Sequence, residues 1–274
     1  MSETSLMSKV AQVSELREQG FVVARGMIPE ARVNALRDVS ERQLTAAQTP
    51  LELEADLRYP GAPCSRHTPG GYTVRRLLNA YERGPLFAKC ATLPEIREWM
   101  MVYFGEKPYL SRSHHNSIMT KHPAYGSLTG WHRDARYWSF ERDDLVSVWI
   151  ALGKETVENG ALWFVPRSHR LDLTAECFDD AKFLNADMPE NRELLGTAVS
   201  PELEPGDVVF FHCKTLHSAG RNLTDHVKYS LVYTYRGESN APLPETRSAS
   251  MPDVALAWYS TNLRNRTHEE LSCN

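Results

Sequence analysis

The sequence contains few cysteines, and their spacing excludes the usual cysteine-based sites. There are five in 274 residues, an odd number, and no two are separated by only two residues. A Cys-x-x-Cys redox or zinc pair is therefore absent, and a disulfide framework is not indicated. The five are Cys64, Cys90, Cys177, Cys213 and Cys273. This usage is typical of free thiols in a reducing compartment, and we expect the protein to be cytoplasmic.

The chain also lacks an excess of charge of either sign and a long apolar run. Thirty-one basic and 35 acidic residues give a formal net charge of −4. This balance gives no electrostatic reason to expect a nucleic-acid partner or an anionic membrane surface. No apolar run approaches the length of a membrane span. The first residues contain neither a basic nor an apolar segment, so they do not predict a secretory signal. Repeats and low-complexity segments are also absent.

The length and the hydrophobic pattern predict a single domain over residues 1–274. Helices are expected at 8–19, from Pro29 to about 43, at 75–81, at 94–104 and at 252–264, with a short strand at 21–24. The N-terminal part, about 8–105, would support a core at about 106–240, and 241–274 would form a C-terminal tail. The Pro- and Gly-rich stretch 45–75 predicts a surface loop or a segment that lines a site.

From residue 109 onward the pattern changes to short β-type runs separated by Gly, Pro and Asn. The predicted strands are 109–121, 129–134, 145–152, 160–165, 197–200, 207–213 and 227–236. Many short strands with turn signals between them predict a barrel or a sandwich, so the fold class is mainly β with flanking helices. The acidic stretch 171–196 interrupts the strands and predicts a crossing loop with a short helix.

The stretch from Gly130 to Asp134 contains the first candidate metal ligands. In a strand the side chains of residues i and i+2 lie on the same face, so His132 and Asp134 could bind one metal ion. A second histidine from a distant strand would complete a two-histidine, one-carboxylate site, which suits non-haem Fe(II) and leaves coordination positions open. A His-x-Asp triplet by itself is common and can equally be a surface loop.

The second candidate segment follows the turn Pro205-Gly206-Asp207, after which a buried strand leads to His217. His212 lies within that strand and His226 lies beyond the next turn, and both compete with His217 for the role of ligand. A histidine inside a strand is more often packed and hydrogen-bonded than bound to metal. The residues alone leave His212 and His217 as rivals.

Three segments together resemble the phytanoyl-CoA dioxygenase family within the Fe(II)- and 2-oxoglutarate-dependent oxygenases. They are Gly130-Trp131-His132-Arg133-Asp134, Val148 to His169 with the core Glu158-Asn159-Gly160, and Pro205 to Asn222 with His217-Ser218-Ala219-Gly220. Their order and spacing match across roughly 105–236, and the elements at 8–43 resemble the opening of the family.

The resemblance implies a double-stranded β-helix, also called a jelly roll, a fold shared with the cupins. It implies that His132, Asp134 and His217 are the metal ligands and the catalytic centre. It also implies Fe(II) as the metal, with 2-oxoglutarate and O₂ as co-substrates. Asp134 is present, whereas related halogenases have a small residue at that position, so hydroxylation is favoured over halogenation.

The co-substrate side of the site departs from the family pattern. The family usually places an arginine eleven residues after the second histidine, where it pairs with the distal carboxylate of the 2-oxo acid. Lys228 occupies that position here and offers a compact charge in place of a two-pronged grip. Arg221 and Arg236 are alternative partners. Thr129 and Trp149 are further candidates for binding the co-substrate.

The function expected from this resemblance is hydroxylation of an unactivated C–H bond of a small molecule, with release of succinate and CO₂. Two alternatives remain. One is a cupin-type metal protein with other chemistry, and the other is a non-catalytic binding module. Lys121 matches a lysine often found in the family. The candidates for the pocket mouth are Tyr59, Arg66, His67, Arg75, His114, Asn116, Trp138 and Arg142.

Overall fold

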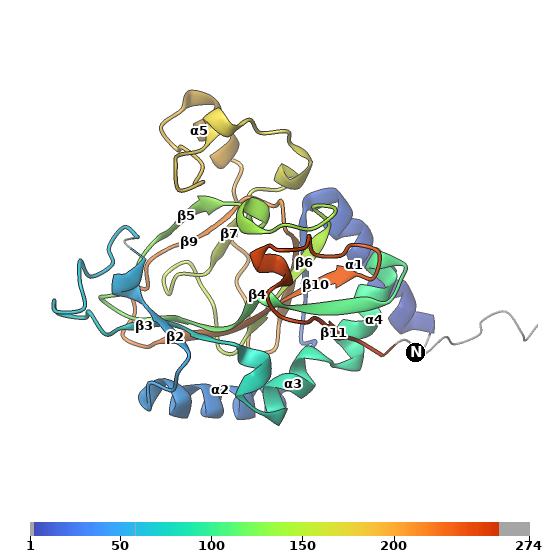
Figure 1. Cartoon of the computed structure of the whole chain (residues 1–274), viewed down its shortest axis with the longest axis horizontal. Helices are drawn as coiled ribbons and strands as arrows, with labels where there is room; N and C mark the ends of the chain where they lie inside the picture. The colour runs from blue at the N-terminus through green and yellow to red at the C-terminus, as the bar shows by residue number, and fades with distance from the viewer. Residues whose placement is uncertain (1–2, 58, 258–274) are drawn as a thin grey trace, which may run out of the picture.

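Two facing β-sheets form the centre of the protein in a computed structural model that describes residues 3–57 and 59–257 (Figure 1). The larger sheet has eight strands, and β11 pairs with β4 beside the main path. In spatial order that path is β1 (Phe21–Ala24), β8 (Val208–His212), β6 (Leu145–Ala151), β10 (Lys228–Gly237), β4 (Pro108–Lys121), β3 (Val74–Leu78) and β2 (Leu51–Leu53). The strand β11 is Val254–Ala255. All these pairings are antiparallel.

The smaller sheet has three strands in the order β5 (Thr129–His132), β9 (His217–Ala219) and β7 (Leu162–Phe164). An apolar cluster fills the space between the sheets, with Trp149, Val209 and Val232 from the larger sheet and Leu162 and Phe164 from the smaller one. The predicted jelly roll is confirmed. The two sheets remain separate and do not close into a barrel.

Strand β8 shows how the sequence forms two cores from one strand. Its residues alternate between two clusters, because successive side chains in a strand lie on opposite faces. Val208 and Phe210 belong to the core under the helices, whereas Val209 and Phe211 belong to the core between the sheets. An uninterrupted apolar run therefore predicts a strand that is covered on both faces.

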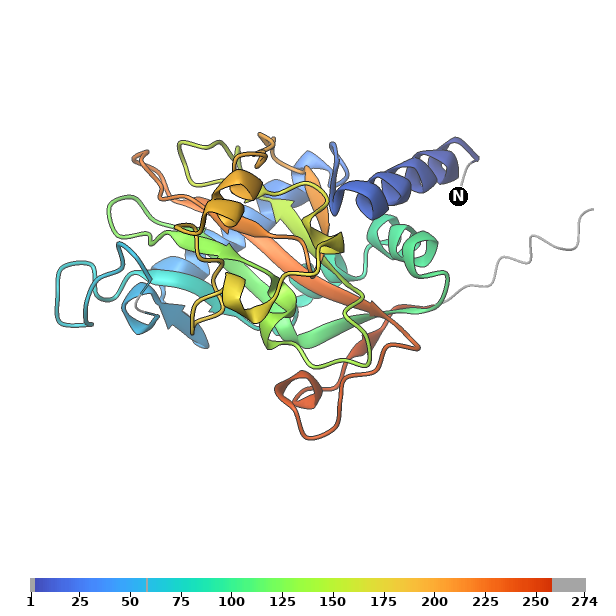
Figure 2. The same ribbon diagram turned by 90° about the horizontal axis from the view of Figure 1, so that it is seen from above.

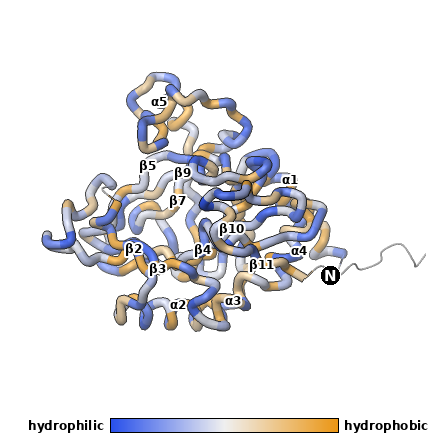
Figure 3. The backbone as a smooth tube through the Cα atoms, viewed as in Figure 1, coloured by the Kyte–Doolittle hydropathy of each residue, from blue (hydrophilic) through white to orange (hydrophobic). Residues whose placement is uncertain are grey.

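Helices cover the outer face of the larger sheet, where α2 and α3 lie below it in Figure 1. Their bounds are α1 (Glu3–Gln19), α2 (Glu30–Thr45), α3 (Pro85–Ala91) and α4 (Pro94–Phe104). Polar and apolar residues alternate along α2 (Figure 3), and Val33 and Leu36 form its buried face. Helix α4 begins at Pro94, which fits a first helical position, and ends at Gly105 with φ +69°.

The strands β4 and β10 carry an irregularity that shapes the interior. Tyr233 pairs with Asn116 and the next residue, Thr234, pairs with Ser111, so residues 112–115 have no counterpart in β10. Bulges of this kind bend a strand and redirect its side chains, and they are frequent beside active sites. In this protein the bulge contains His114 and His115.

Most predicted elements are observed, with some exceptions. The predicted helix at 75–81 is wrong, since residues 74–78 form β3, which lies between β4 and the edge strand β2 in the larger sheet. The predicted strand at 197–200 is reduced to one bridge between Phe164 and Val199. The predicted helix at 252–264 is contradicted where it is described, because β11 lies there, and residues 258–264 lie outside the described residues. The pattern did not predict β2, α3 or β9.

The segment 171–196 passes over the end of the small sheet (Figures 1 and 2), and it contains the short helix α5 (Pro189–Leu195). The backbone N–H of Leu184 donates to the carbonyl of Trp131 over 2.8 Å, which joins this segment to β5. The predicted crossing loop with a short helix is confirmed. Over residues 3–57 and 59–257, no helix is long and apolar enough to cross a membrane.

Candidate metal centre and co-substrate pocket

His132 and His217, which are far apart in the sequence, lie opposite each other on neighbouring strands. In the small sheet β5 pairs with β9, and His132 is the register partner of His217. Their ring centroids are 4.2 Å apart. Asp134 begins the short 3-10 helix Asp134–Tyr137 that directly follows β5. Strand pairing therefore joins residues that are 85 positions apart in the chain.

Hydrogen bonds direct the Nε2 atom of each histidine into the site. The Nδ1 atom of His132 lies 2.8 Å from the carbonyl of Gly130, and that of His217 lies 3.0 Å from the carbonyl of Thr215. A carbonyl only accepts, so each Nδ1 carries the ring proton and each Nε2 is left with a free electron pair. This arrangement is the one that metal-binding histidines usually have.

The carboxylate of Asp134 is held from two sides. The hydroxyl of Ser147 donates to its Oδ2 atom over 2.8 Å, and the Nε2 atom of His115 lies 2.8 Å from its Oδ1 atom. Burial acts to raise the pKa of Asp134, but the neighbouring imidazoles, first of all that of His115 with its hydrogen bond, outweigh it and hold the pKa well below the ordinary value. Asp134 is therefore a carboxylate at neutral pH.

The donor set fits a divalent transition metal. One ligand atom from each of His132, Asp134 and His217 lies within 4.8 Å of the other two, and all three residues are buried. Burial, followed by the neighbouring His217, lowers the pKa of His132 well below its ordinary value, so that ring is neutral and free to bind metal. Two imidazoles and one carboxylate on one side of a site form the arrangement that suits non-haem Fe(II).

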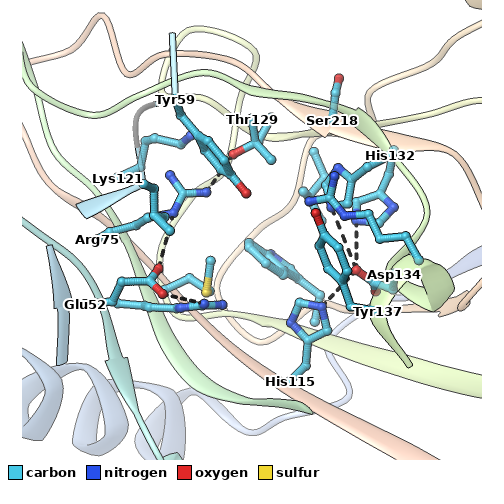
Figure 4. Close-up of a pocket in the computed structure, with 18 of the residues that line it drawn as sticks. Glu52, Tyr59, Arg75, His115, Lys121, Thr129, His132, Asp134, Tyr137 and Ser218 are labelled. Atoms are coloured by element: carbon cyan, nitrogen blue, oxygen red, sulfur yellow. Dashed lines mark hydrogen bonds and ion pairs between the residues drawn. The ribbon is translucent and has the colours of Figure 1, made fainter. Parts of the chain in front are cut away.

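The three residues open onto a pocket of about 530 Å³ between the sheets. Figure 4 shows two groups of side chains across this space, with Tyr59, Arg75, Lys121 and Thr129 on one side and His132 and Asp134 on the other. Such a volume is large enough for a small-molecule ligand. The pocket therefore joins a candidate metal site at one wall to a group of cations at the other.

The predicted co-substrate residues Lys228, Thr129 and Trp149 all line this pocket. Each already has a partner inside the chain. The ammonium of Lys228 lies 2.9 Å from the Oε2 atom of Glu155, and the indole N–H of Trp149 donates to the Oε1 atom of Glu155 over 2.9 Å. The hydroxyl of Thr129 accepts a hydrogen bond of 2.9 Å from Arg75.

The functional residues that the sequence analysis missed are Glu155, His115 and Ser147. Glu155 is fully buried, which is unusual for a carboxylate unless it is paired. Its position between two glycines in a turn-rich stretch gave no sign of burial. His115 approaches Asp134 because of the bulge in β4, and only the strand pairing reveals that bulge. Ser147 could have been found from the sequence. It is a polar residue in an otherwise apolar run that forms the wholly buried strand β6, and a buried hydroxyl needs a hydrogen-bond partner.

The rival histidines lie elsewhere. His212 packs at the end of β8, where its Nδ1 atom accepts a hydrogen bond from the backbone N–H of Lys214. Burial, with the nearby His169, lowers the pKa of His212 to about 3. The side chain of His226 is 89% exposed. Arg236 pairs with Asp253 over 2.6 Å, and Arg221 donates to the carbonyl of Ala124. Interactions within the protein thus direct both arginines away from the co-substrate role.

Four of the eight candidates for the pocket mouth line the pocket, namely Tyr59, Arg75, His114 and Trp138. The other four have different surroundings. Arg66 pairs with Asp56, Asn116 donates to Glu82, Arg142 donates to Ser239, and His67 is exposed. Lys121, which matches a lysine often found in the family, also lines the pocket.

Two aromatic side chains from separate loops, Tyr59 and Phe183, meet in the lining of the pocket. The ring of Phe183, from the segment 171–196, lies 5.8 Å from His132 and meets Tyr59 edge to face at 5.3 Å. The guanidinium of Arg136 stands 4.2 Å from the ring centroid of Phe183. The stretch 45–75, predicted to be either a loop or the lining of a site, contributes Tyr59 and Arg75 to the pocket.

Comparison with known proteins identifies a family that matches this sequence. The model of the phytanoyl-CoA dioxygenase (PhyH) family matches residues 16–230. The human peroxisomal phytanoyl-CoA dioxygenase is 28% identical over 218 residues, which are 76% of this chain and 62% of that protein. The ectoine dioxygenase of Sphingopyxis alaskensis is 26% identical over 63% of this chain and 60% of its own length. The chain spans about three fifths of the length of these curated relatives.

Solved structures show the same fold. The epimerase SnoN, in a complex with Fe³⁺, alpha ketoglutarate and nogalamycin RO, superposes with a TM-score of 0.69 at 22% identity and covers 93% of this chain and 97% of its own. EctD from S. alaskensis, with 2-oxoglutarate and 5-hydroxyectoine, gives a TM-score of 0.70 at 20% identity over 85% and 77% of the two chains. With the family model matching most of the sequence, this protein belongs to the phytanoyl-CoA dioxygenase family.

Proposed function

We propose that this protein is an Fe(II)- and 2-oxoglutarate-dependent dioxygenase that hydroxylates an unactivated C–H bond of a small molecule, releasing succinate and CO₂. The observation that carries the proposal is the convergence of His132, Asp134 and His217 on one side of the 530 Å³ pocket. Membership of the family supports the enzyme class and its cofactors Fe(II), 2-oxoglutarate and O₂. We further propose that residues 1–274 act as one domain.

In this proposal the triad holds the iron, which supplies the activation of O₂ when it is bound. The protein prepares the three ligands in advance. Each histidine has its proton fixed on Nδ1 by a backbone carbonyl, and Asp134 is kept ionised and oriented by Ser147 and His115. Because these hydrogen bonds fix the two tautomers and the orientation of the carboxylate, the three ligand atoms would need little reorganisation to hold iron.

The remainder of the pocket would hold the co-substrate and the substrate. Lys228, Thr129 and Trp149 line the same pocket as the triad, which supports a role for them in holding a 2-oxo acid. The substrate would enter past Tyr59 and Phe183, whose rings restrict the mouth and reduce access of water. The relatives include an ectoine dioxygenase and an epimerase from nogalamycin biosynthesis, which supports a small-molecule substrate for this chain as well.

The test is an anaerobic titration of the metal-free protein with Fe(II) and then with 2-oxoglutarate, followed through the visible metal-to-ligand charge-transfer band. We expect the band in the native protein and in His212→Ala, and its loss in His132→Ala and His217→Ala. His212→Ala is the matched control, since it removes a buried imidazole five residues from His217. If iron binds but no band forms, the assignment of 2-oxoglutarate as the co-substrate is contradicted. If iron does not bind, the assignment of the triad as the iron ligands is contradicted.

Hydroxylation needs its own measurement. A panel of small metabolites is screened for compounds that stimulate succinate release, and the products are examined by mass spectrometry. A stimulating compound that gains one oxygen atom supports hydroxylation. A compound that stimulates succinate release and is recovered as an isomer, with no oxygen added, would contradict it.

A further inference from the structure

Two lysines face each other across neighbouring strands at the wall of the pocket opposite the metal site. Lys121 at the end of β4 is the register partner of Lys228 at the start of β10, and both line the pocket. Like charges directly opposite each other on antiparallel strands are destabilising, because their side chains start only about 5 Å apart. Both residues are buried, so water does not screen the repulsion.

Glu155 reduces this repulsion, because its carboxylate pairs with one of the two lysines, Lys228. Its Oε2 atom accepts from Lys228, and its Oε1 atom accepts from Ser230 over 2.6 Å and from Trp149 over 2.9 Å. Lys228 also donates to the hydroxyl of Ser230 over 3.2 Å. An ammonium has three N–H donors, so one remains for a ligand in the pocket. The positive charge of Lys228 is nevertheless already matched by a carboxylate that is fully buried.

Within residues 3–57 and 59–257, the two arginines of this wall are also paired with carboxylates, whereas Lys121 is not. Arg75 lies 3.3 Å from Glu54, and Arg76 pairs with Glu52 over 2.6 Å. Lys121 differs, because its ammonium donates to a neutral group, the carbonyl of Ser127, over 2.8 Å. Among the residues that the structure describes, no carboxylate lies within ion-pair distance of Lys121. The uncompensated positive charge of this wall therefore resides on Lys121.

We propose that Glu155 is a specificity-determining residue for the co-substrate, because it neutralises Lys228 and leaves Lys121 to supply the net charge that attracts the distal carboxylate of 2-oxoglutarate. This inference rests on the proposed function. It predicts that the preference for 2-oxoglutarate over a 2-oxo acid without a distal carboxylate depends on Lys121 and is restrained by Glu155. Removing the charge of Glu155 strengthens the preference, and removing the charge of Lys121 abolishes it.

The experiment measures the affinity of the Fe(II)-loaded protein for 2-oxoglutarate and for 2-oxopentanoate, which has the same chain without the distal carboxylate. Both are followed through the charge-transfer band. Glu155→Gln keeps the size and the acceptor oxygen while removing the charge, and it should raise the preference for 2-oxoglutarate about tenfold. Lys121→Met should reduce the preference to near equality. Glu158→Gln is the matched control, an exposed glutamate three residues away that should leave the preference unchanged.

The outcomes separate this inference from the function on which it rests. If the native protein forms the band but Glu155→Gln leaves the preference unchanged or lowers it, the role of Glu155 is overturned and the proposed function stands. If Glu155→Gln does not fold, Lys121→Met still decides, because a preference that survives that change overturns the inference. If the native protein forms no band with either acid, the proposed function fails and the inference fails with it.

Discussion

The Nε2 atom of His115 lies 2.8 Å from the Oδ1 atom of Asp134, the oxygen of that carboxylate that faces both histidines of the triad. His115 reaches this position only because residues 112–115 form a bulge in β4. In a regular strand, His114 and His115 would lie on opposite faces, yet both line the pocket. The bulge therefore places a third imidazole beside the proposed metal site, although His115 is not one of the three proposed ligands.

We predict that His115→Ala weakens metal binding about tenfold, because partners that orient a metal ligand usually account for that much or more. The measurement is an anaerobic titration with Fe(II), or with Co(II), whose visible absorption reports binding directly. His115→Gln retains an N–H donor and should recover part of the loss. His226→Ala removes an exposed histidine and should have no effect. Unchanged affinity in His115→Ala would show that Ser147 alone is sufficient to position Asp134.

Lys121 predicts a pH dependence of co-substrate binding. Burial, followed by the nearby Arg75 and Lys228, lowers the pKa of Lys121 to about 7, while Glu54 acts in the opposite direction. The ammonium is charged below this pKa and neutral above it, and only the charged form attracts a carboxylate. The affinity for 2-oxoglutarate should therefore be highest below about pH 7 and should fall, by at most tenfold per pH unit, as the pH rises.

The measurement is the dissociation constant of 2-oxoglutarate for the Fe(II)-loaded protein between about pH 6 and about pH 9. Because ligand binding favours the charged form, the affinity should begin to fall near the pKa of Lys121 in the free protein and level off at the higher pKa of Lys121 in the complex. Lys121→Met should bind more weakly and show a flat profile over this range. The same slope in Lys121→Met and in the native protein would assign the pH dependence to another group.

The buried pair of Lys228 and Glu155 predicts strong coupling in stability. Lys228→Met leaves the fully buried Glu155 without its cation and should lower the free energy of unfolding by about 3–5 kcal/mol. Combining it with Glu155→Gln should restore much of the loss, because neither charge then remains buried alone. Urea denaturation of the two single variants and the double variant measures this coupling. Additive losses would mean that the two residues do not stabilise each other.

The packing of Trp99 predicts that the helices stabilise the fold without contributing to the candidate site. It is fully buried on α4, its ring stacks on Phe210 of β8 at 3.9 Å, and its N–H donates to Gln12 of α1 over 3.1 Å. Trp99→Ala should lower the free energy of unfolding by about 3–5 kcal/mol while iron affinity stays unchanged. Trp163→Ala, at a half-buried position, should cost clearly less. Equal losses in urea denaturation would contradict this assignment.

The elements that the sequence predicted well are those with a strong periodic pattern. The strand at 21–24 and the helix at 94–104 agree with the structure because apolar spacing, Pro94 and Gly105 all indicate the same bounds. The wrong helix at 75–81 shows the limit. Residues 74–78, Val-Arg-Arg-Leu-Leu, contain good helix formers, but pairing with β4 and β2 places them in a sheet. Local propensity could not reveal that tertiary pairing.

The candidate site divides in the same manner. His132 and Asp134 are singled out by their two-residue spacing on a predicted strand 129–134, but β5 ends at His132 and Asp134 lies in the 3-10 helix that follows. The family pattern then distinguished His217 from His212. Lys228 could be identified by its distance from His217 along the chain. Glu155 could not, because its significance depends on which residue lies opposite it across the fold. Strand register places Lys121 opposite Lys228, but the contacts of Lys228 with Glu155 and of Lys121 with the carbonyl of Ser127 depend on loops brought together by the fold.

The sequence by itself determined the fold class, the family and the three residues proposed to hold iron, because these depend on motifs whose order and spacing are preserved along the chain. Only the tertiary structure decided the charge of the co-substrate pocket and the environment of Asp134. A bulge in β4 moves His115 to the carboxylate, and the register of β4 against β10 places Lys121 opposite Lys228. Electrostatic energy depends on distance in space and on burial, and neither quantity is encoded at any single position of the chain.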